Sequence, residues 1–431
     1  MTRNGNDVGP GSVRRTVGPV GDPESVGWWE RLWTPFWVLP SVITVAAGVL
    51  GLALPRVDQA MGSDVPYLFG GGADSARGLL STIATAMISV TGLVFSITLV
   101  VMQLASSQFT PRLIGQFLSS RVTQLTLGVF TSSFVFALII LRDVRGGAEP
   151  FVPQLSVTVA FLLVLASVAV FFAFIHHITT SIQVGQVIDR VALRTVQSLE
   201  RGDDEEWDST SADPPTWSQA PGPSVVVTTG DGHGTVQRVH YSHLVERASA
   251  AGVVVELRTR LGDVRHRGQE LALVHGAVAD DDIVGEVRSA FGLGRDRTMG
   301  QDPEFGVRQL VDIAERALSP GINDPTTAVQ VLDELHRILR RAASRADRSA
   351  YLVDGGGVVR VIDAPTTFAR LLDLSLDEIA HYGADTLQVP AHIDLVLEDL
   401  ESMARQEHAA TVVAKRADLR SRHGGRHEAP A

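Results

Sequence analysis

The stretch "LLSTIATAMISVTGLVFSITLVVMQL", residues 79–104, decides the fold class of this chain. It contains no Asp, Glu, Lys or Arg anywhere along its length. A helix of about 20 apolar residues crosses the hydrocarbon core of a bilayer. We therefore predict that this stretch is a membrane-spanning helix.

Three other stretches have the same character, and each is free of charged residues in its interior: residues 36–54, 122–141 and 155–178. Several polar residues precede the first stretch, and no short signal-type hydrophobic region stands before it, so we interpret it as a retained span. The sequence thus predicts a disordered tail at 1–27 and a four-span transmembrane domain at 28–180. The lipid bilayer is the first expected partner.

Positive residues beside the spans indicate an orientation, because cytoplasmic loops carry the excess of Arg and Lys. Arg112 and Arg121 lie between the second and third spans without an acidic neighbour, whereas both outer loops mix Arg with Asp or Glu. This bias predicts that the N- and C-termini are both cytoplasmic.

The second span carries polar and small residues at spacings of three and four, which places them on one helical face. They are Thr82, Thr85, Ser89, Gly92, Ser96 and Gln103. Two interpretations are open. The stripe is either a packing seam, since small residues allow close helix contact in lipid, or the lining of a pore. Four spans can hardly enclose a wide path, so a pore would need a homo-oligomer. The spans contain no carboxylate that could relay protons.

The composition excludes several classes of protein. The 431 residues include no cysteine, which removes disulfides, thiol catalysis and Cys-based metal sites. A net charge of −11 argues against a nucleic-acid partner. His240 and His243 are three apart but lack a third ligand with suitable spacing, so no metal and no cofactor are expected. Lys415 is the only lysine among the basic residues. A functional use of arginine would show as clusters, and few are visible.

The remainder of the chain predicts an α+β cytoplasmic part. After the spans come a connecting helix at 181–200 and an acidic Pro/Ser linker at 201–223. Short β-prone runs bounded by Gly predict a β-rich module at 224–300, with turns like those of barrel-sandwich domains. A helical module at 301–406 contains a β-hairpin around Gly355, and the tail at 407–431 is expected to be disordered.

The most distinctive motif of the cytoplasmic part is "SPGINDP", residues 319–325. Asp324 is a helix N-cap and Pro325 suits the first helical position. A structural turn between two helices accounts for the motif. The functional alternative is a small polar site made of Arg297, Asp302, Asn323 and Asp324. No pair of nucleophile and base is visible, so an enzyme is the least favoured class.

Two stretches carry a resemblance to a known family: "SVTGLVFSITLVVMQLASSQFTPRL" and "RTMGQDPEFGVRQLVDIAERALSPGINDPTTA". Through them the chain resembles the bacterial predicted-membrane-protein family catalogued as domain of unknown function 2254. The resemblance covers residues 30–410. It implies a bacterial plasma-membrane protein with a cytoplasmic remainder, and it brings no activity, substrate or catalytic residue.

Two functions follow as hypotheses. The first is an oligomeric channel or channel-like transporter regulated by its cytoplasmic domain. The second is a non-catalytic membrane scaffold or sensor whose cytoplasmic part binds an unidentified partner or ligand.

Overall fold

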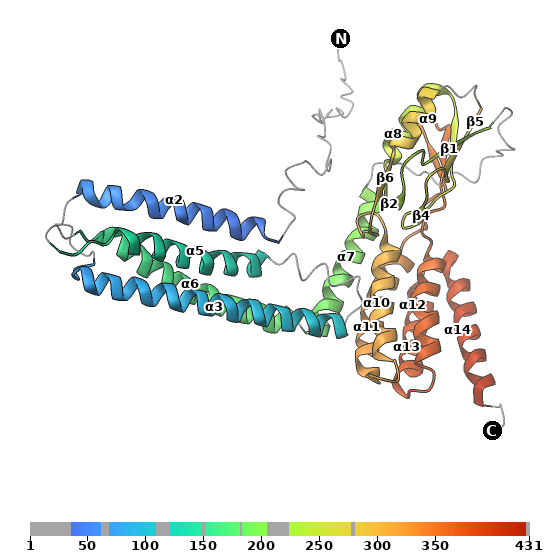
Figure 1. The fold of residues 1–431 in the computed structure, drawn as a ribbon. Helices are drawn as coiled ribbons and strands as arrows, with labels where there is room; N and C mark the ends of the chain where they lie inside the picture. Colours follow the sequence, from blue (N-terminus) through green and yellow to red (C-terminus); the bar gives the residue numbers. More distant parts are fainter. Residues whose placement is uncertain are drawn as a thin grey trace, which may run out of the picture. The chain divides into compact units, whose positions relative to one another are not determined.

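A computed structural model describes residues 36–61, 69–108, 121–147, 151–181, 183–204, 224–276 and 281–427 (Figure 1). The chain divides into two compact units. We call residues 1–99 with 116–175 the span unit, and residues 100–115 with 176–431 the α+β unit. The predicted tail at 1–27 and most of the predicted linker at 201–223 lie outside the described residues.

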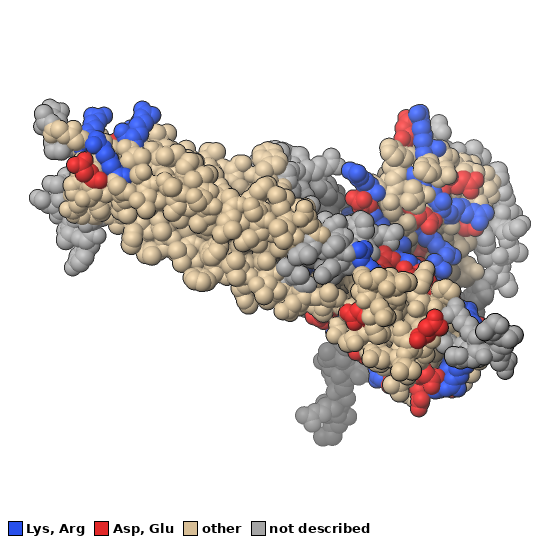
Figure 2. Space-filling view, turned by 60° about the horizontal axis from the view of Figure 1, so that its bottom comes forward, with Lys and Arg blue, Asp and Glu red and all other residues tan. Residues whose placement is uncertain are grey.

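The span unit contains four helices that are long and apolar enough to cross a membrane, as the sequence predicted. On the face that Figure 2 shows, charged side chains gather near one end of the long apolar surface of this unit. The helices are α2 (Val38–Met61), α3 (Ala73–Gln108), α5 (Arg121–Asp143) and α6 (Gln154–Ser181).

Helix α5 is the most buried of the four, and it packs against α2 through small residues. A Cβ atom on Gly128 would stand 2.8 Å from Ile43 Cδ1 and 3.1 Å from the Cα of Pro40. The hydroxyl oxygens of Ser133 on α5 and Ser167 on α6 lie 3.1 Å apart and are buried. The polar residues of the third span therefore serve packing within the bundle.

A carboxylate ties the end of α2 to the start of α6. Asp58 accepts hydrogen bonds from the backbone N–H groups of Leu155 (2.8 Å) and Ser156 (3.1 Å), and from the Ser156 hydroxyl (2.6 Å). The first N–H groups of a helix have no partner inside the helix, so this acidic cap satisfies two of them.

The α+β unit begins with α7 (Val184–Asp204), which covers the predicted connecting helix. Two sheets follow. The first has five strands in the order β1-β5-β3-β8-β7, and the second has three in the order β4-β2-β6. The strands are β1 (Ser224–Thr228), β2 (Gly234–Val239), β3 (Val254–Leu257), β4 (Val264–Arg265), β5 (Glu270–His275), β6 (Phe291–Gly294), β7 (Tyr351–Val353) and β8 (Val359–Ile362).

The β7–β8 hairpin changes the predicted module boundary. We placed this hairpin in a helical module at 301–406, yet β8 pairs in parallel with β3, with Val255 beside Val361 and Glu256 beside Ile362. The hairpin thus completes a sheet that starts at residue 224. Such long-range pairing depends on the tertiary fold and is not visible in local periodicity.

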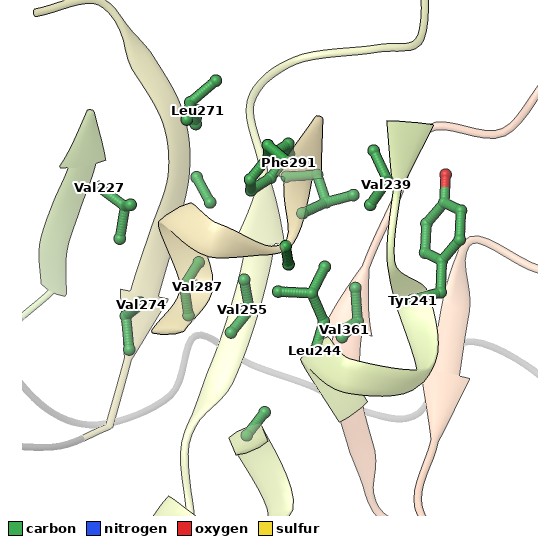
Figure 3. Packing of buried hydrophobic residues seen from close by; sticks show 14 of the residues in the cluster. Val227, Val239, Tyr241, Leu244, Val255, Leu271, Val274, Val287, Phe291 and Val361 are labelled. Carbon is green, nitrogen blue, oxygen red and sulfur yellow. The ribbon is translucent and has the colours of Figure 1, made fainter. Parts of the chain in front are cut away.

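The sheets and the helices α8 (Tyr241–Ala251) and α9 (Asp281–Ser289) enclose one apolar core (Figure 3). Leu244, Val255, Leu271 and Val287 are fully buried there. Val361 of the late hairpin belongs to the same core. This shared burial holds residues 224–294 and 351–362 together as one packed body.

The helical part consists of α7 and five later helices. These are α10 (Pro303–Ala317), α11 (Pro325–Ala343), α12 (Phe368–Tyr382), α13 (Gln388–Met403) and α14 (Gln406–His427). Asp302 and Asp324 cap α10 and α11 by accepting hydrogen bonds from the N–H groups of Phe305 (3.1 Å) and Thr327 (3.0 Å). The predicted cap at Asp324 is confirmed. Helices α7 and α10 approach so closely that a Cβ atom on Gly306 would fall 1.9 Å from Thr195 Oγ1.

The predicted disordered tail at 407–431 is wrong for most of its length, because α14 runs to His427. Val412 and Leu419 are buried on its inner face. Lys415 is only 7% exposed, and its ammonium lies 2.6 Å from Asp373 and 2.9 Å from Asp377 on α12. Pairing charges across two helices allows a sequence rich in Arg and Ala to dock although its apolar face is narrow.

We expect Lys415→Met to lower the stability of the α+β unit. The substitution leaves Asp373 and Asp377 without their buried cation and should cost about 1–2 kcal/mol, since both carboxylates are partly solvated. Thermal unfolding of the full chain in detergent, with proteolysis of α14, measures the effect. Arg422→Met is the matched control, because Arg422 pairs with the same Asp377 but is 56% exposed. Equal melting temperatures for both variants and the wild type would contradict the expectation.

Three carboxylates surround one guanidinium where α10 packs on α12. Arg308 donates to Asp312 (2.6 Å) and Glu378 (2.6 Å), and lies 3.4 Å from Glu315. Burial raises the pKa of Glu315 to about 7, and its hydrogen bond with Glu378 adds to this effect. The Arg308 guanidinium instead lowers the pKa of Glu378. The Glu315 carboxyl therefore keeps its proton to a higher pH than the Glu378 carboxyl does.

This pair predicts a pH dependence of stability. The folded state holds the Glu315 proton more tightly than the unfolded state, whose pKa is about 4.5. The free energy of unfolding should therefore fall as the pH rises from about 5 to about 7. Glu315→Gln should flatten this slope in unfolding measured at half-unit pH steps. Glu401→Gln, an exposed position on α13, should leave the slope in place. An unchanged slope in Glu315→Gln would show that another group titrates.

Candidate functional site

A cavity of about 250 Å³ opens in the α+β unit where the sheets, α7, α11 and α12 meet. We call it the arginine cleft. Its lining contains six arginines and four carboxylates. The arginines are Arg260, Arg297, Arg341, Arg345, Arg348 and Arg370; the carboxylates are Asp263, Glu304, Asp347 and Asp363.

The four carboxylates are engaged in holding the fold. Asp263 accepts from the backbone N–H of Arg260 (3.0 Å), and Asp347 accepts from the N–H of Phe368 (2.7 Å) at the start of α12. Asp363 accepts from the Tyr241 hydroxyl (2.8 Å). Glu304 accepts from the Thr366 hydroxyl (3.0 Å). Each of the four carboxylates thus accepts at least one hydrogen bond from within the α+β unit.

Three of the arginines form ion pairs within 3.4 Å at the edge of the cleft, and a fourth, Arg345, lies 3.9 Å from Glu200. Arg297 makes a two-pronged contact with the buried Asp302, at 2.5 and 3.0 Å. Arg370 lies 3.4 Å from Glu304. Arg341 lies 2.8 Å from Glu200 on α7. Each guanidinium has five donors, so these pairs leave donor capacity for a further acceptor.

Arg348 differs from these three. Its guanidinium carbon lies 4.6 Å from the centre of the Tyr241 ring, and Tyr241 is buried. Its Nη2 atom is buried and has no hydrogen-bond partner among the described residues. Stacking on an aromatic ring fixes a guanidinium without using its donors. Arg348 is thus a positioned cation whose buried Nη2 is not used by the described residues.

The cleft is suited to an anion. Guanidinium groups bind carboxylate and phosphate oxygens in a bidentate manner, and several in one concave site raise the local positive potential. The cavity lies just below the usual range for ligand pockets, roughly 300–1,000 Å³. The arrangement therefore favours a compact ligand with more than one negative charge.

The predicted polar site is only partly assembled. Arg297 and Asp302 meet as an ion pair, and Arg297 lines the arginine cleft. Asn323 and Asp324 stand beyond the other end of α10, about 20 Å away at 1.5 Å rise per residue. The four residues do not form one site. Asn323 is left-handed with a φ of 50°, and Asp324 caps α11, which fits the structural interpretation of the SPGIND turn.

The stripe on the second span faces outward. Its six members, Thr82, Thr85, Ser89, Gly92, Ser96 and Gln103, are all exposed. Leu80, Val94 and Val101 on the opposite face of α3 are buried. Thr82 and Ser89 donate their hydroxyl hydrogens to the carbonyls four residues earlier, both at 2.8 Å. Among the described residues the stripe is therefore no packing seam within one chain.

Sequence reasoning missed five of the six cleft arginines. Arg260, Arg341, Arg345, Arg348 and Arg370 come from three separate parts of the chain. Only the run from Arg341 to Arg348, at spacings of three and four, is dense enough to attract notice.

A second polar constellation lies on the five-stranded sheet. Ser224 Oγ is 2.8 Å from His275 Nδ1, and His275 Nε2 is 2.9 Å from Glu256. The three residues sit on β1, β5 and β3, and none lines the arginine cleft. We interpret them as a cross-strand polar ladder. The described residues contain no cluster of His, Asp and Glu that could hold a metal ion.

Four helices long and apolar enough to span a membrane, found among the described residues, and an α+β unit with an arginine-lined cavity define a predicted polytopic membrane protein. The chain belongs to the family of predicted membrane proteins catalogued as domain of unknown function 2254, whose model matches residues 33–399. It is 32% identical to uncharacterized proteins of Mycobacterium bovis and Mycobacterium tuberculosis over 383 residues, which is 86% of this chain and 71% of each relative. No solved structure matches the chain.

Proposed function

We propose that this protein is a membrane-anchored sensor whose α+β unit binds a small, multiply charged anion in the arginine cleft. The observation that carries the proposal is Arg348, which is stacked on Tyr241 with a buried Nη2 that has no partner in the part of the chain that the structure describes. Five further arginines surround the same cavity. A cationic cavity with pre-positioned donors lowers the entropic cost of binding an anion.

The same proposal includes the cell location. We infer that the spans lie in the bacterial plasma membrane and that the α+β unit is cytoplasmic. The distribution of Arg between the loops supports this orientation. Metabolites with several phosphate or carboxylate groups would then reach the cleft from the cytoplasm.

Isothermal titration of the full-length protein in detergent with inorganic pyrophosphate and with citrate tests the proposal. We expect binding to one of them at physiological ionic strength and none to a neutral sugar. Arg348→Ala should weaken binding by about tenfold to a hundredfold, the value of one charge-assisted hydrogen bond.

Arg267→Ala is the matched control, because Arg267 is 76% exposed, pairs with Asp231 and lies outside the cleft. It should bind as the wild type does. Arg348→Lys keeps the charge but loses the planar fork, and should be intermediate. If no anion binds at millimolar concentration, or if Arg348→Ala binds as tightly as Arg267→Ala, the proposed function is wrong.

A second candidate function rests on the outward stripe of α3. We propose that α3 meets the α3 of other copies in a homo-oligomer, which could be channel-like. The supporting observation is that polar and small residues occupy the exposed face of a span, where lipid-facing positions normally carry large apolar residues. Adding a Cβ atom to Gly92 would meet nothing within 4 Å in a single copy.

The lack of cysteine makes this candidate testable by cross-linking in native membranes. Ser89→Cys should give disulfide-linked dimers under mild oxidation. Phe95→Cys is the control, because Phe95 is 51% exposed on the same helix but lies about 90° away from the stripe. If neither the Ser89→Cys nor the Phe95→Cys variant forms cross-linked dimers, the proposed oligomer is excluded. If liposomes that contain the protein show ion flux and Ser96→Leu abolishes that flux, the result favours a pore over a contact between helices.

A further inference from the structure

The C-terminal part of α7, at residues 198–200, forms one wall of the arginine cleft. Ser198 and Leu199 line the cavity. The next residue, Glu200, places its carboxylate 2.8 Å from Arg341 and 3.9 Å from Arg345. Helix α7 thus supplies a negative group to two of the arginines that would hold an anion.

Helix α7, which carries Glu200, directly follows the last span in the chain. Helix α6, the last span, ends at Ser181, and α7 begins at Val184. The cleft and the last span are therefore joined covalently through a single helix. Upstream of the cleft, α7 is fixed by burial, with Ile188, Val191 and Thr195 almost inaccessible. In its C-terminal part, Ser198 is buried and lies 3.5 Å from the Gly300 carbonyl, whereas Glu200 is 40% exposed and is held by its ion pair.

We propose that Glu200 is an internal stand-in for the anion, and that a bound ligand displaces it from Arg341 and Arg345. The proposal rests on the proposed function and adds its regulation. A ligand oxygen that takes the position of the Glu200 carboxylate between Arg341 and Arg345 would use the same donors, so its binding is coupled to release of the C-terminal part of α7. Coupling of this kind is reciprocal, so weakening the Glu200 contact strengthens ligand binding.

The size of the effect follows from the exposure of the pair. A partly exposed ion pair contributes up to about 1 kcal/mol, which corresponds to about fivefold in a binding constant. Glu200→Gln should therefore tighten binding of pyrophosphate by about twofold to fivefold. It should do so without a large loss of stability, because glutamine has nearly the same shape.

Hydrogen exchange separates displacement from simple removal of a nearby negative charge. In the wild type, saturating pyrophosphate should increase amide exchange across residues 196–204. In Glu200→Gln, exchange there should already be high without ligand and should change little on binding. Both measurements use the full chain in detergent, with citrate as a second anion.

Asp189→Asn is the matched control on the same helix. Asp189 pairs with Arg337 at 3.5 Å, and neither residue lines the cleft. It should leave both the affinity and the ligand response unchanged. If pyrophosphate binds but Glu200→Gln neither tightens it nor alters exchange in α7, the displacement is wrong and the sensor stands. If neither anion binds any variant, the proposed function itself has failed.

Discussion

The buried carboxylate of Asp302 is the contact on which the α+β unit depends. It is 3% exposed, caps α10 at Phe305 and holds Arg297 with both oxygens. The side-chain amide of the preceding residue, Gln301, accepts a hydrogen bond from the Val239 N–H in β2 (3.0 Å) and donates one to the Val239 carbonyl (3.3 Å). Two adjacent residues thus fasten a sheet to a helix bundle. Removing the carboxylate would leave a half-buried guanidinium unpaired and a helix uncapped, a costly combination.

The arginine cleft follows from this joint. It lies where the sheets, α7, α11 and α12 converge, so no single module could form it. Its acids accept hydrogen bonds from a turn, from the start of α12 and from two hydroxyl groups, while six arginines line the cavity. Arg348 depends on Tyr241, a core residue of the β-rich part, for its orientation. Packing of Tyr241 in the core of the β-rich part therefore positions the Arg348 guanidinium at the cleft.

Polar side chains find their partners in different ways in the two units. In the span unit, the hydroxyls of α5 and α6 meet inside the bundle, whereas those of α3 return to their own backbone carbonyls and face outward. In the α+β unit, charged groups are paired across helices, as at Lys415 and Arg308. The exposed face of α3 and the arginine cleft are the two surfaces on which the proposed functions rest.

The sequence by itself determined the four spans, since hydrocarbon thickness and the absence of charge act locally. It also predicted the strand segments, the Asp324 cap and the membership of the family, because alternation, turn residues and capping are short-range signals. Residues 407–427 were misjudged because their docking is carried by Lys415 and its distant aspartates. Only the tertiary structure decided that the 351–362 hairpin joins β3, that the α3 stripe faces away from its own bundle, and that arginines from 260 to 370 line one cavity. Each of these depends on contacts between residues far apart in the chain, and local periodicity carries no information about them.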